Sequence, residues 1–164
     1  VFFDTKFDLV GDIHSFGHDI EATWLMDLAC DTLGDEELKK QFAEMDLKIS
    51  HNIQNIALDN GALNNEREND KIDKKRVWWV EAESVVGFIN AYQHSGEKKF
   101  LESARSVWEY IKAEIIDKRE GPEWYAEVSY DHKPHDWKEI VGPWKCPYHN
   151  GRMCMEVINR GVDF

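Results

Sequence analysis

Proline is absent from the first 121 residues of this chain, and all four prolines lie at or after Pro122. Proline lacks a backbone N–H and breaks the interior of helices and central strands. Regular structure can therefore continue without interruption before Pro122, and the irregular part of the chain is predicted at residues 121–148.

Basic residues are outnumbered, because 20 Lys and Arg stand against 32 Asp and Glu and give a net charge of −12. An excess of negative charge repels phosphate groups. The composition therefore argues against nucleic acids and anionic membrane surfaces as partners. The charges are interspersed, which predicts a solvated acidic exterior. No apolar run approaches the ~20 residues of a membrane span, so we expect no membrane association.

Cysteine is also scarce, with Cys30, Cys146 and Cys154 and no CxxC pair. This odd number without a paired motif favours a reducing compartment, and we expect a cytoplasmic protein without disulfides. Cys146, Cys154 and His149 are candidate ligands of one metal, but no second cluster completes a tetrahedral set, so no metal is expected. The chain begins with Val1 and shows no signal peptide, which predicts a processed or cut N-terminus.

Helical periodicity accounts for most of what is present. Residues 1–16 are predicted to be an extended lead-in, 61–77 a loop or hairpin with a strand at Ala62-Leu63, and 123–128 a strand. Gly121-Pro122 is expected to end the fourth helix. Five helices are predicted, over about residues 17–32, 35–58, 78–94, 97–116 and 149–160.

The helices repeat with a countable period. Gly34 and Gly96 are 62 residues apart, and each separates the two helices of a pair. Glu21 and Glu83 are also 62 apart, each inside the first helix of its pair, and a third unit opens at His149, 66 residues after Glu83. Helix pairs with such a period stack side by side and bury a shared core. The fold class is therefore all-α, built from about two and a half helix-hairpin repeats.

The first helix has an unusual first turn. His18, Glu21, Leu25 and Leu28 fall on one side at 100° per residue, together with Ala22 and Ala29. This side is predicted to be the apolar, core-facing one. A carboxylate is rarely placed on such a face without a partner. The turn is therefore a candidate site, and the alternative is a capping carboxylate beside a structural histidine.

Chemically similar groups recur at the start of each first helix. If equivalent helices line one wall, these groups gather at one rim of the fold, and three clusters in matching phase favour a functional site. Trp78 points away from Glu83 on a helix and is expected to be core. The clusters are His18 and Glu21; Trp78, Trp79 and Glu83; and His149 and Arg152.

The chemistry of this set is that of proton transfer. The sequence has no nucleophile elbow and no glycine-rich phosphate loop. Exposed indole rings suit the apolar faces of sugars, and paired histidines suit acid–base catalysis near neutral pH. A carboxylate beside each histidine would fix its tautomer and orientation.

Three motifs, GHDIEATWL, WWVEAESVVGF and WKCPYHNGR, occur in order between residues 14 and 160. They resemble the N-acylglucosamine 2-epimerase superfamily, most of all its members that act on cellobiose. The resemblance implies an (α/α)6 barrel of twelve helices. Residues 1–164 would then be a single, partial domain from the C-terminal half of that barrel.

The resemblance also implies an activity without metal or organic cofactor, the epimerisation of a sugar at C2. The substrate would be a small reducing-end aldose, such as a β-1,4-linked disaccharide. After ring opening, one histidine removes the C2 proton, and return of a proton to the other face of the enediolate inverts C2. The implied acid–base residues are His18 and His149, their supporting carboxylates are Glu21 and Glu83, and the sugar-binding residues are Trp24, Trp79, Arg152 and, with a poorer motif match, His14.

Other functions stay open at this point. The same superfamily includes N-acylglucosamine 2-epimerases and mannose-type aldose–ketose isomerases. A glycoside hydrolase on the same barrel type would use Glu21 and Glu83 as its catalytic pair. An inactive sugar-binding fragment is a further alternative. An open barrel edge predicts self-association, or association with the N-terminal half of the barrel.

Overall fold

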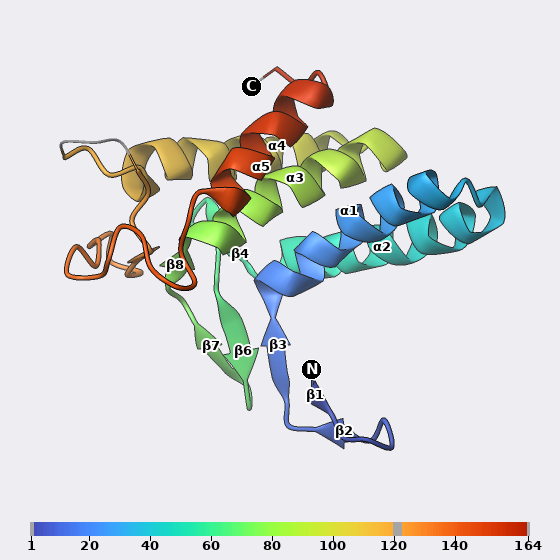
Figure 1. Ribbon diagram of the computed structural model, residues 1–164, viewed down its shortest axis with the longest axis horizontal. Coiled ribbons are helices and arrows are strands. Elements are labelled where there is room, and N and C mark those ends of the chain that lie inside the picture. Colours follow the sequence, from blue (N-terminus) through green and yellow to red (C-terminus); the bar gives the residue numbers. More distant parts are fainter. Residues whose placement is uncertain (1, 120–122, 164) are drawn as a thin grey trace.

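The computed structural model describes residues 2–119 and 123–163. Over these residues no helix is both long and apolar enough to cross a membrane. The chain folds into two helix pairs and a fifth helix, with short strands between them (Figure 1). The α-helices are α1 (Phe16–Leu33), α2 (Glu36–Ile56), α3 (Trp78–Ser95), α4 (Lys98–Tyr110) and α5 (Tyr148–Asn159).

One glycine separates the two helices of each pair, as predicted. Gly34 ends α1 with φ = 68° and Gly96 ends α3 with φ = 72°, both in the left-handed region that glycine adopts without steric cost. Asp35 then caps α2 by accepting a hydrogen bond from the backbone N–H of Leu38 at 2.9 Å. The predicted boundaries of the first helix pair are therefore confirmed to within two residues.

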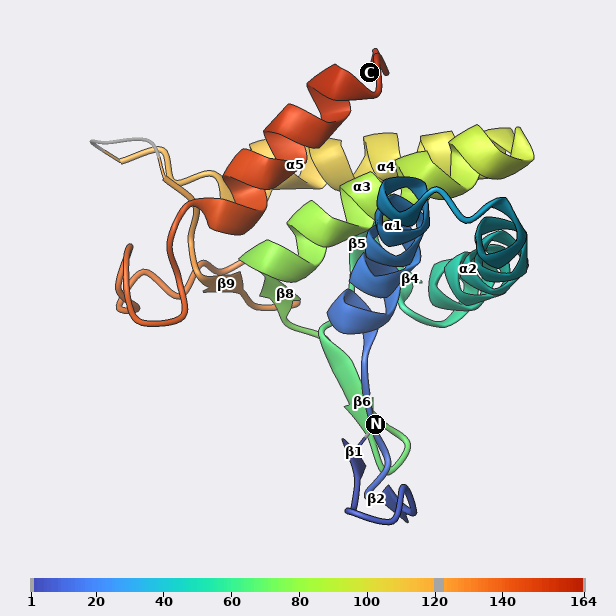
Figure 2. The same cartoon turned by 45° about the vertical axis from the view of Figure 1, so that its right-hand side comes forward.

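The helices stack in the order that a hairpin repeat requires. Helix α1 packs on α2 and α3 packs on α4, while α3 also contacts both α1 and α5 (Figures 1 and 2). The first helices of successive pairs are thus neighbours, with α3 in the middle. Their N-terminal ends are brought to the same side of the molecule, where the sequence places its polar clusters.

Short antiparallel strands lead into these N-terminal ends. The largest sheet has the order β3-β6-β7, and Ser15 of β3 opposite Glu66 of β6 fixes its register. β3 runs directly into α1, and β8, paired with β9, runs into α3. The strands are β1 (Phe2–Phe3), β2 (Leu9–Val10), β3 (Ile13–Ser15), β4 (Leu58–Asp59), β5 (Ala62–Leu63), β6 (Glu66–Glu68), β7 (Lys71–Asp73), β8 (Arg76–Val77) and β9 (Glu127–Val128).

Two predicted elements differ in the structure. The fourth helix ends as an α-helix at Tyr110 and continues as a π-helix, η1 (Ile111–Ile115). The strand expected over 123–128 is reduced to β9 and an isolated bridge between Ile116 and Trp124. The end of this unit at Gly121-Pro122 lies outside the described residues.

The buried face of α1 also differs from the predicted one. The helix buries Ile20, Thr23, Trp24 and Cys30 between α2 and α3, whereas Leu28 on the predicted core face is 48% exposed. Apolar residues occur on all sides of α1, so periodicity could not choose the face. The side that bears His18 is instead turned away from the core, which leaves it available for a site.

Candidate active site

The N-terminal turns of α1, α3 and α5 surround a cavity of about 380 Å³. Its lining residues are His18, Trp79, Trp144, Tyr148 and His149. Each of the three predicted clusters contributes a side chain. The structure therefore brings together both histidines and one tryptophan that the sequence analysis selected, although they lie up to 131 positions apart in the chain.

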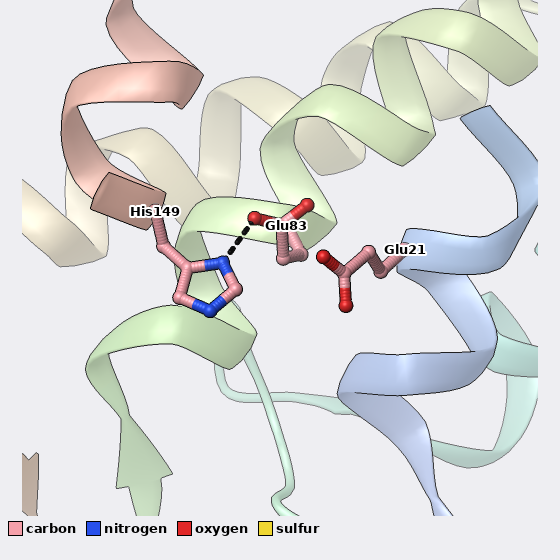
Figure 3. Close-up of side chains that lie close together, drawn as sticks. All are labelled: Glu21, Glu83 and His149. Carbon is pink, nitrogen blue, oxygen red and sulfur yellow. Dashed lines mark hydrogen bonds and ion pairs between the residues drawn. The ribbon is translucent and has the colours of Figure 1, made fainter. Parts of the chain in front are cut away.

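His149 is held by a buried carboxylate. Its Nδ1 lies 2.6 Å from Oε1 of Glu83, which is 1% exposed (Figure 3). An ionised carboxylate only accepts hydrogen bonds, so the proton belongs on Nδ1. A second contact, 3.3 Å to Nη2 of Arg152, is longer and would need a bare Nδ1. The shorter bond prevails, so in the neutral ring the proton is on Nδ1 and Nε2, which points away from Glu83 (Figure 3), is the free nitrogen.

Glu83 on α3 accepts three hydrogen bonds from side chains on two other helices, α1 and α5. In addition to His149 of α5, its Oε1 accepts from Nη2 of Arg152 at 2.8 Å, and its Oε2 accepts from Nε1 of Trp24 on α1 at 3.0 Å. Fixed donors on both oxygens compensate for the loss of water around a buried carboxylate. Glu83 therefore joins the first helices of all three units.

Arg152 lies between two carboxylates. Its Nη2 donates to Oε1 of Glu21 at 2.5 Å as well as to Glu83, and its guanidinium carbon is 4.9 Å from the centre of the Trp24 ring. Burial lowers the pKa of Arg152, but the two carboxylates outweigh it and raise the pKa overall. The guanidinium thus stays charged and neutralises the acidic pair beside it.

His18 has a different support from the one expected. Its Nδ1 is 2.8 Å from Oγ of Ser15, while Glu21 pairs with Arg152. The predicted pairing of His18 with Glu21 is therefore wrong. The ring of His18 instead lies 4.7 Å from that of Trp79, tilted by 46°. Gly17 permits this approach, because a Cβ there would be 2.6 Å from the Trp79 ring.

Three predicted sugar-binding residues, Trp24, Arg152 and His14, do not line the cavity. Trp24 is only 1% exposed, and its indole is occupied by Glu83 and Arg152. His14 lies in β3 with Nε2 3.1 Å from Oδ1 of Asp12. Trp78 is 3% exposed, as expected for a core residue, and meets the ring of His149 edge-on.

Two cavity residues were not selected from the sequence. Trp144 is 88% exposed, and Tyr148, 48% exposed, has its ring 4.1 Å from that of His149. Both occur in the WKCPYHNGR motif, which was used only for His149 and Arg152. The sequence does contain a signal for Trp144, because this residue lies in a polar, proline-containing segment that offers little apolar core to bury an indole ring.

Glu21, Glu83 and His149 also have the composition of a metal site. Their potential ligand atoms lie within 4.8 Å of one another. The guanidinium of Arg152 already donates to both carboxylates, and a cation would have to displace it. Their arrangement therefore fits an arginine–carboxylate cluster better than a metal centre.

Stacked helix hairpins with a polar cavity at the N-terminal ends of their first helices define the class of α/α-barrel proteins. Within that class, the N-acylglucosamine 2-epimerase (GlcNAc 2-epimerase) family model matches residues 4–150. The chain belongs to this family.

Similar proteins agree with this assignment. Cellobiose 2-epimerase of Ruminococcus albus is 82% identical over 163 residues, which are 99% of this chain and 42% of that protein. Cellobiose 2-epimerase of Dictyoglomus turgidum is 48% identical over 98% of this chain and 41% of its own length. The chain thus spans about two fifths of the length of these relatives.

A solved structure agrees with the fold. The crystal structure of a sugar epimerase from a ruminal bacterium superposes with a TM-score of 0.97 at 81% identity, covering 99% of this chain and 42% of that one. The helix pairs described here are therefore part of an (α/α)6 barrel, and the predicted fold class is confirmed.

Proposed function

We propose that the protein containing this chain is a sugar 2-epimerase that acts at C2 of a reducing-end aldose, with a cellobiose-like β-1,4 disaccharide as substrate. The observation that carries the proposal is the pair of histidines on one cavity, with Nδ1 of His149 bound to Glu83 and Nε2 facing away from it (Figure 3). The name of the Ruminococcus albus relative supports the substrate.

Inversion at C2 needs two proton-transfer groups. The proton on C2 becomes acidic once the ring has opened to the aldehyde. One histidine takes it, the electron pair delocalises into an enediolate, and the other histidine, in its protonated form, returns a proton to the opposite face. His18 on α1 and His149 on α5 line the same cavity from separate helices, as this scheme requires.

The surrounding residues have supporting roles in this proposal. Glu83 fixes the tautomer of His149 and stabilises the imidazolium that forms. Trp24 and Glu21 are positioning residues that hold Glu83 and Arg152, in place of the sugar contact and the His18 contact predicted for them. Trp79 and Trp144 offer ring faces to the sugar. His14 takes no part, and no metal or organic cofactor is required.

The geometry disfavours a glycoside hydrolase. A hydrolase would need Glu21 and Glu83 on either side of a scissile bond. Here one nitrogen of Arg152 bonds to both carboxylates, and this leaves no room for a sugar between them. An aldose–ketose isomerase would share the enediolate and differ only in moving the proton between O1 and O2, so product analysis separates it from an epimerase.

The outer face of α5 supports a proposal about association. Exposed apolar side chains on the outer face of α5, Met155 at 60% and Ile158 at 77%, support association with the rest of the barrel or with a second copy. A sharp monomer of the 164-residue chain in sedimentation would contradict this.

The free state of Cys30, Cys146 and Cys154 agrees with a reducing compartment, and we propose the cytoplasm.

The test uses proton NMR in D2O with the full-length product of the gene. Cellobiose, glucose and N-acetylglucosamine are incubated separately with the wild type and with His149→Asn. We expect deuterium at C2 together with the 2-epimer of cellobiose, and no exchange with the folded variant. A ketose product would indicate the isomerase. A folded wild type that exchanges C2 of none of the sugars would overturn the proposal.

A further inference from the structure

A largely buried ion pair joins Lys145, the residue after Trp144, to Glu123. The side chain of Lys145 is 7% exposed, and its Nζ lies 3.3 Å from Oε1 of Glu123 and 2.8 Å from the carbonyl oxygen of Ile140. A lysine is rarely buried to this extent unless its charge is paired. Neither member of the pair lines the cavity.

The same oxygen of Glu123 also binds the chain at Asn150, at the far end of the turn 145–150. Oε1 also accepts from Nδ2 of Asn150 at 3.0 Å and from the backbone N–H of Trp124 at 2.9 Å. Lys145 directly follows Trp144, and Asn150 directly follows His149. One carboxylate oxygen therefore holds the chain next to Trp144 and next to His149, both of which line the cavity.

Lys145 also supports the imidazole through Trp78. Its Nζ is 5.0 Å from the centre of the Trp78 ring, within the range of a cation–π contact. The Trp78 ring meets that of His149 edge-on, with centres 5.3 Å apart and an angle of 74°. Glu83 fixes Nδ1 of His149, and Trp78 limits the movement of the ring on another side.

We propose that Glu123 and Lys145 are positioning residues that set the turn 145–150, so that Trp144 and His149 face the same cavity. The inference rests on the proposed function and adds a second support to it, independent of Glu83. General-base catalysis depends on such placement, since an error of 1 Å at a reacting group can cost about 100-fold in rate.

Loss of one charge and loss of both charges have different consequences. Lys145→Met leaves the partly buried carboxylate of Glu123 without its cation, which lowers stability as well as displacing the turn. Glu123→Gln combined with Lys145→Met leaves no unpaired charge, so the Tm should recover towards the wild type. The links to Ile140 and Trp78 stay broken in the double variant, and kcat should therefore stay low.

The chain offers a matched control pair. Lys112 bonds to Oε1 of Glu109 at 2.8 Å, and its Nζ lies 5.6 Å from the ring centre of Trp108, so it makes the same two kinds of contact. This pair is exposed and lies outside the cavity lining. Glu109→Gln and Lys112→Met, singly and together, control for the loss of an ion pair and a cation–π contact.

The experiment measures kcat and KM for epimerisation, Tm, and the NMR signals of the His149 ring in the full-length protein. We expect Lys145→Met and the double variant to lower kcat about tenfold and to shift the His149 signals. Lys145→Arg should restore kcat to within about twofold, and the control variants should retain it. The positioning role would be overturned if Lys145→Met kept the wild-type kcat and ring signals. It would also be overturned if kcat recovered together with the Tm in the double variant. A wild type without C2 exchange would overturn the proposed function alone, because the ring signals of His149 still test the positioning role of Glu123 and Lys145.

Discussion

Glu81 and Glu83 are the same residue type on the same helix, two positions apart, and both are buried, at 0% and 1% exposure. Two positions on a helix differ by about 200°, so the two carboxylates face opposite ways. Glu83 faces three donors, from His149, Arg152 and Trp24. Glu81 accepts one hydrogen bond, at Oε2 from the backbone N–H of Leu63, and its Oε1 has no partner among the described residues.

The difference shows that burial alone does not define a functional carboxylate. Burial raises the pKa of Glu81 to about 8, and the Leu63 N–H and the charge of Arg76 only partly oppose this. Glu81 is therefore mostly protonated at neutral pH and joins the β4–β5 hairpin to α3. The donors around Glu83 instead suit an ionised carboxylate, the form that can stabilise an imidazolium.

The largest expected effect comes from neutralising each carboxylate in turn. Glu83→Gln keeps the shape but removes the charge that orients His149, and we expect kcat/KM for C2 epimerisation to fall by about 100- to 1000-fold. Glu81→Gln should stay within about threefold of the wild type. Steady-state kinetics of both variants measure these changes. Equal losses of kcat/KM would mean that the two carboxylates do not differ in function.

Removal of the cation that Glu83 shares with Glu21 comes next. Arg152→Met leaves two carboxylates in contact without a counter-charge, and we expect the free energy of unfolding to fall by about 2 kcal/mol, less than for a fully buried pair. Adding Glu21→Gln should recover part of this loss. Urea denaturation measures both, and a single variant as stable as the wild type would contradict the bridging role of Arg152.

The pH dependence of stability isolates Glu81. Its pKa is raised in the folded state, so between pH 4.5 and about 8 the unfolded chain binds fewer protons than the folded one. Stability should therefore fall as pH rises through this window, by at most about 1.4 kcal/mol per pH unit from this group. Glu81→Gln should remove that part of the slope in urea titrations at several pH values. An unchanged slope would show that Glu81 is ionised in the folded protein.

The smallest expected effect concerns the second histidine. Ser15 bonds to Nδ1 of His18 as Glu83 bonds to Nδ1 of His149, but Ser15 is a neutral partner. Neutral hydrogen bonds are about half as strong as charge-assisted ones. We expect Ser15→Ala to lower kcat only about threefold. A loss as large as that of Glu83→Gln would place the more demanding proton transfer at His18.

Much of the fold was readable from local signals. The glycines Gly34 and Gly96 and the 62-residue period predicted the helix pairs, and the period also placed the three site helices in one phase. The glycine signals are local because each depends on a single turn, and the period needs only a count of positions along the chain. The fold class and the convergence of His18, Trp79 and His149 on one cavity were predicted correctly.

What could not be predicted depends on contacts between distant elements. The core face of α1 is chosen by how α2 and α3 pack around it, since Leu28 and Ile20 look equally apolar in the sequence. The pairing of Glu21 with Arg152 rather than with His18 depends on how closely α5 approaches α1. Glu21 and Arg152 are 131 positions apart, so no local sequence pattern indicates that they pair.

The central claim is that Glu83 holds His149 with the proton on Nδ1 and with Nε2 free to act as the base. Nitrogen NMR of the full-length protein with labelled histidine, the His149 signals being assigned with His149→Asn, measures this tautomer directly at neutral pH. We predict a protonated Nδ1 and an unprotonated Nε2 in the wild type, and loss of this preference in Glu83→Gln. A proton found on Nε2 of the wild-type neutral ring would contradict the account.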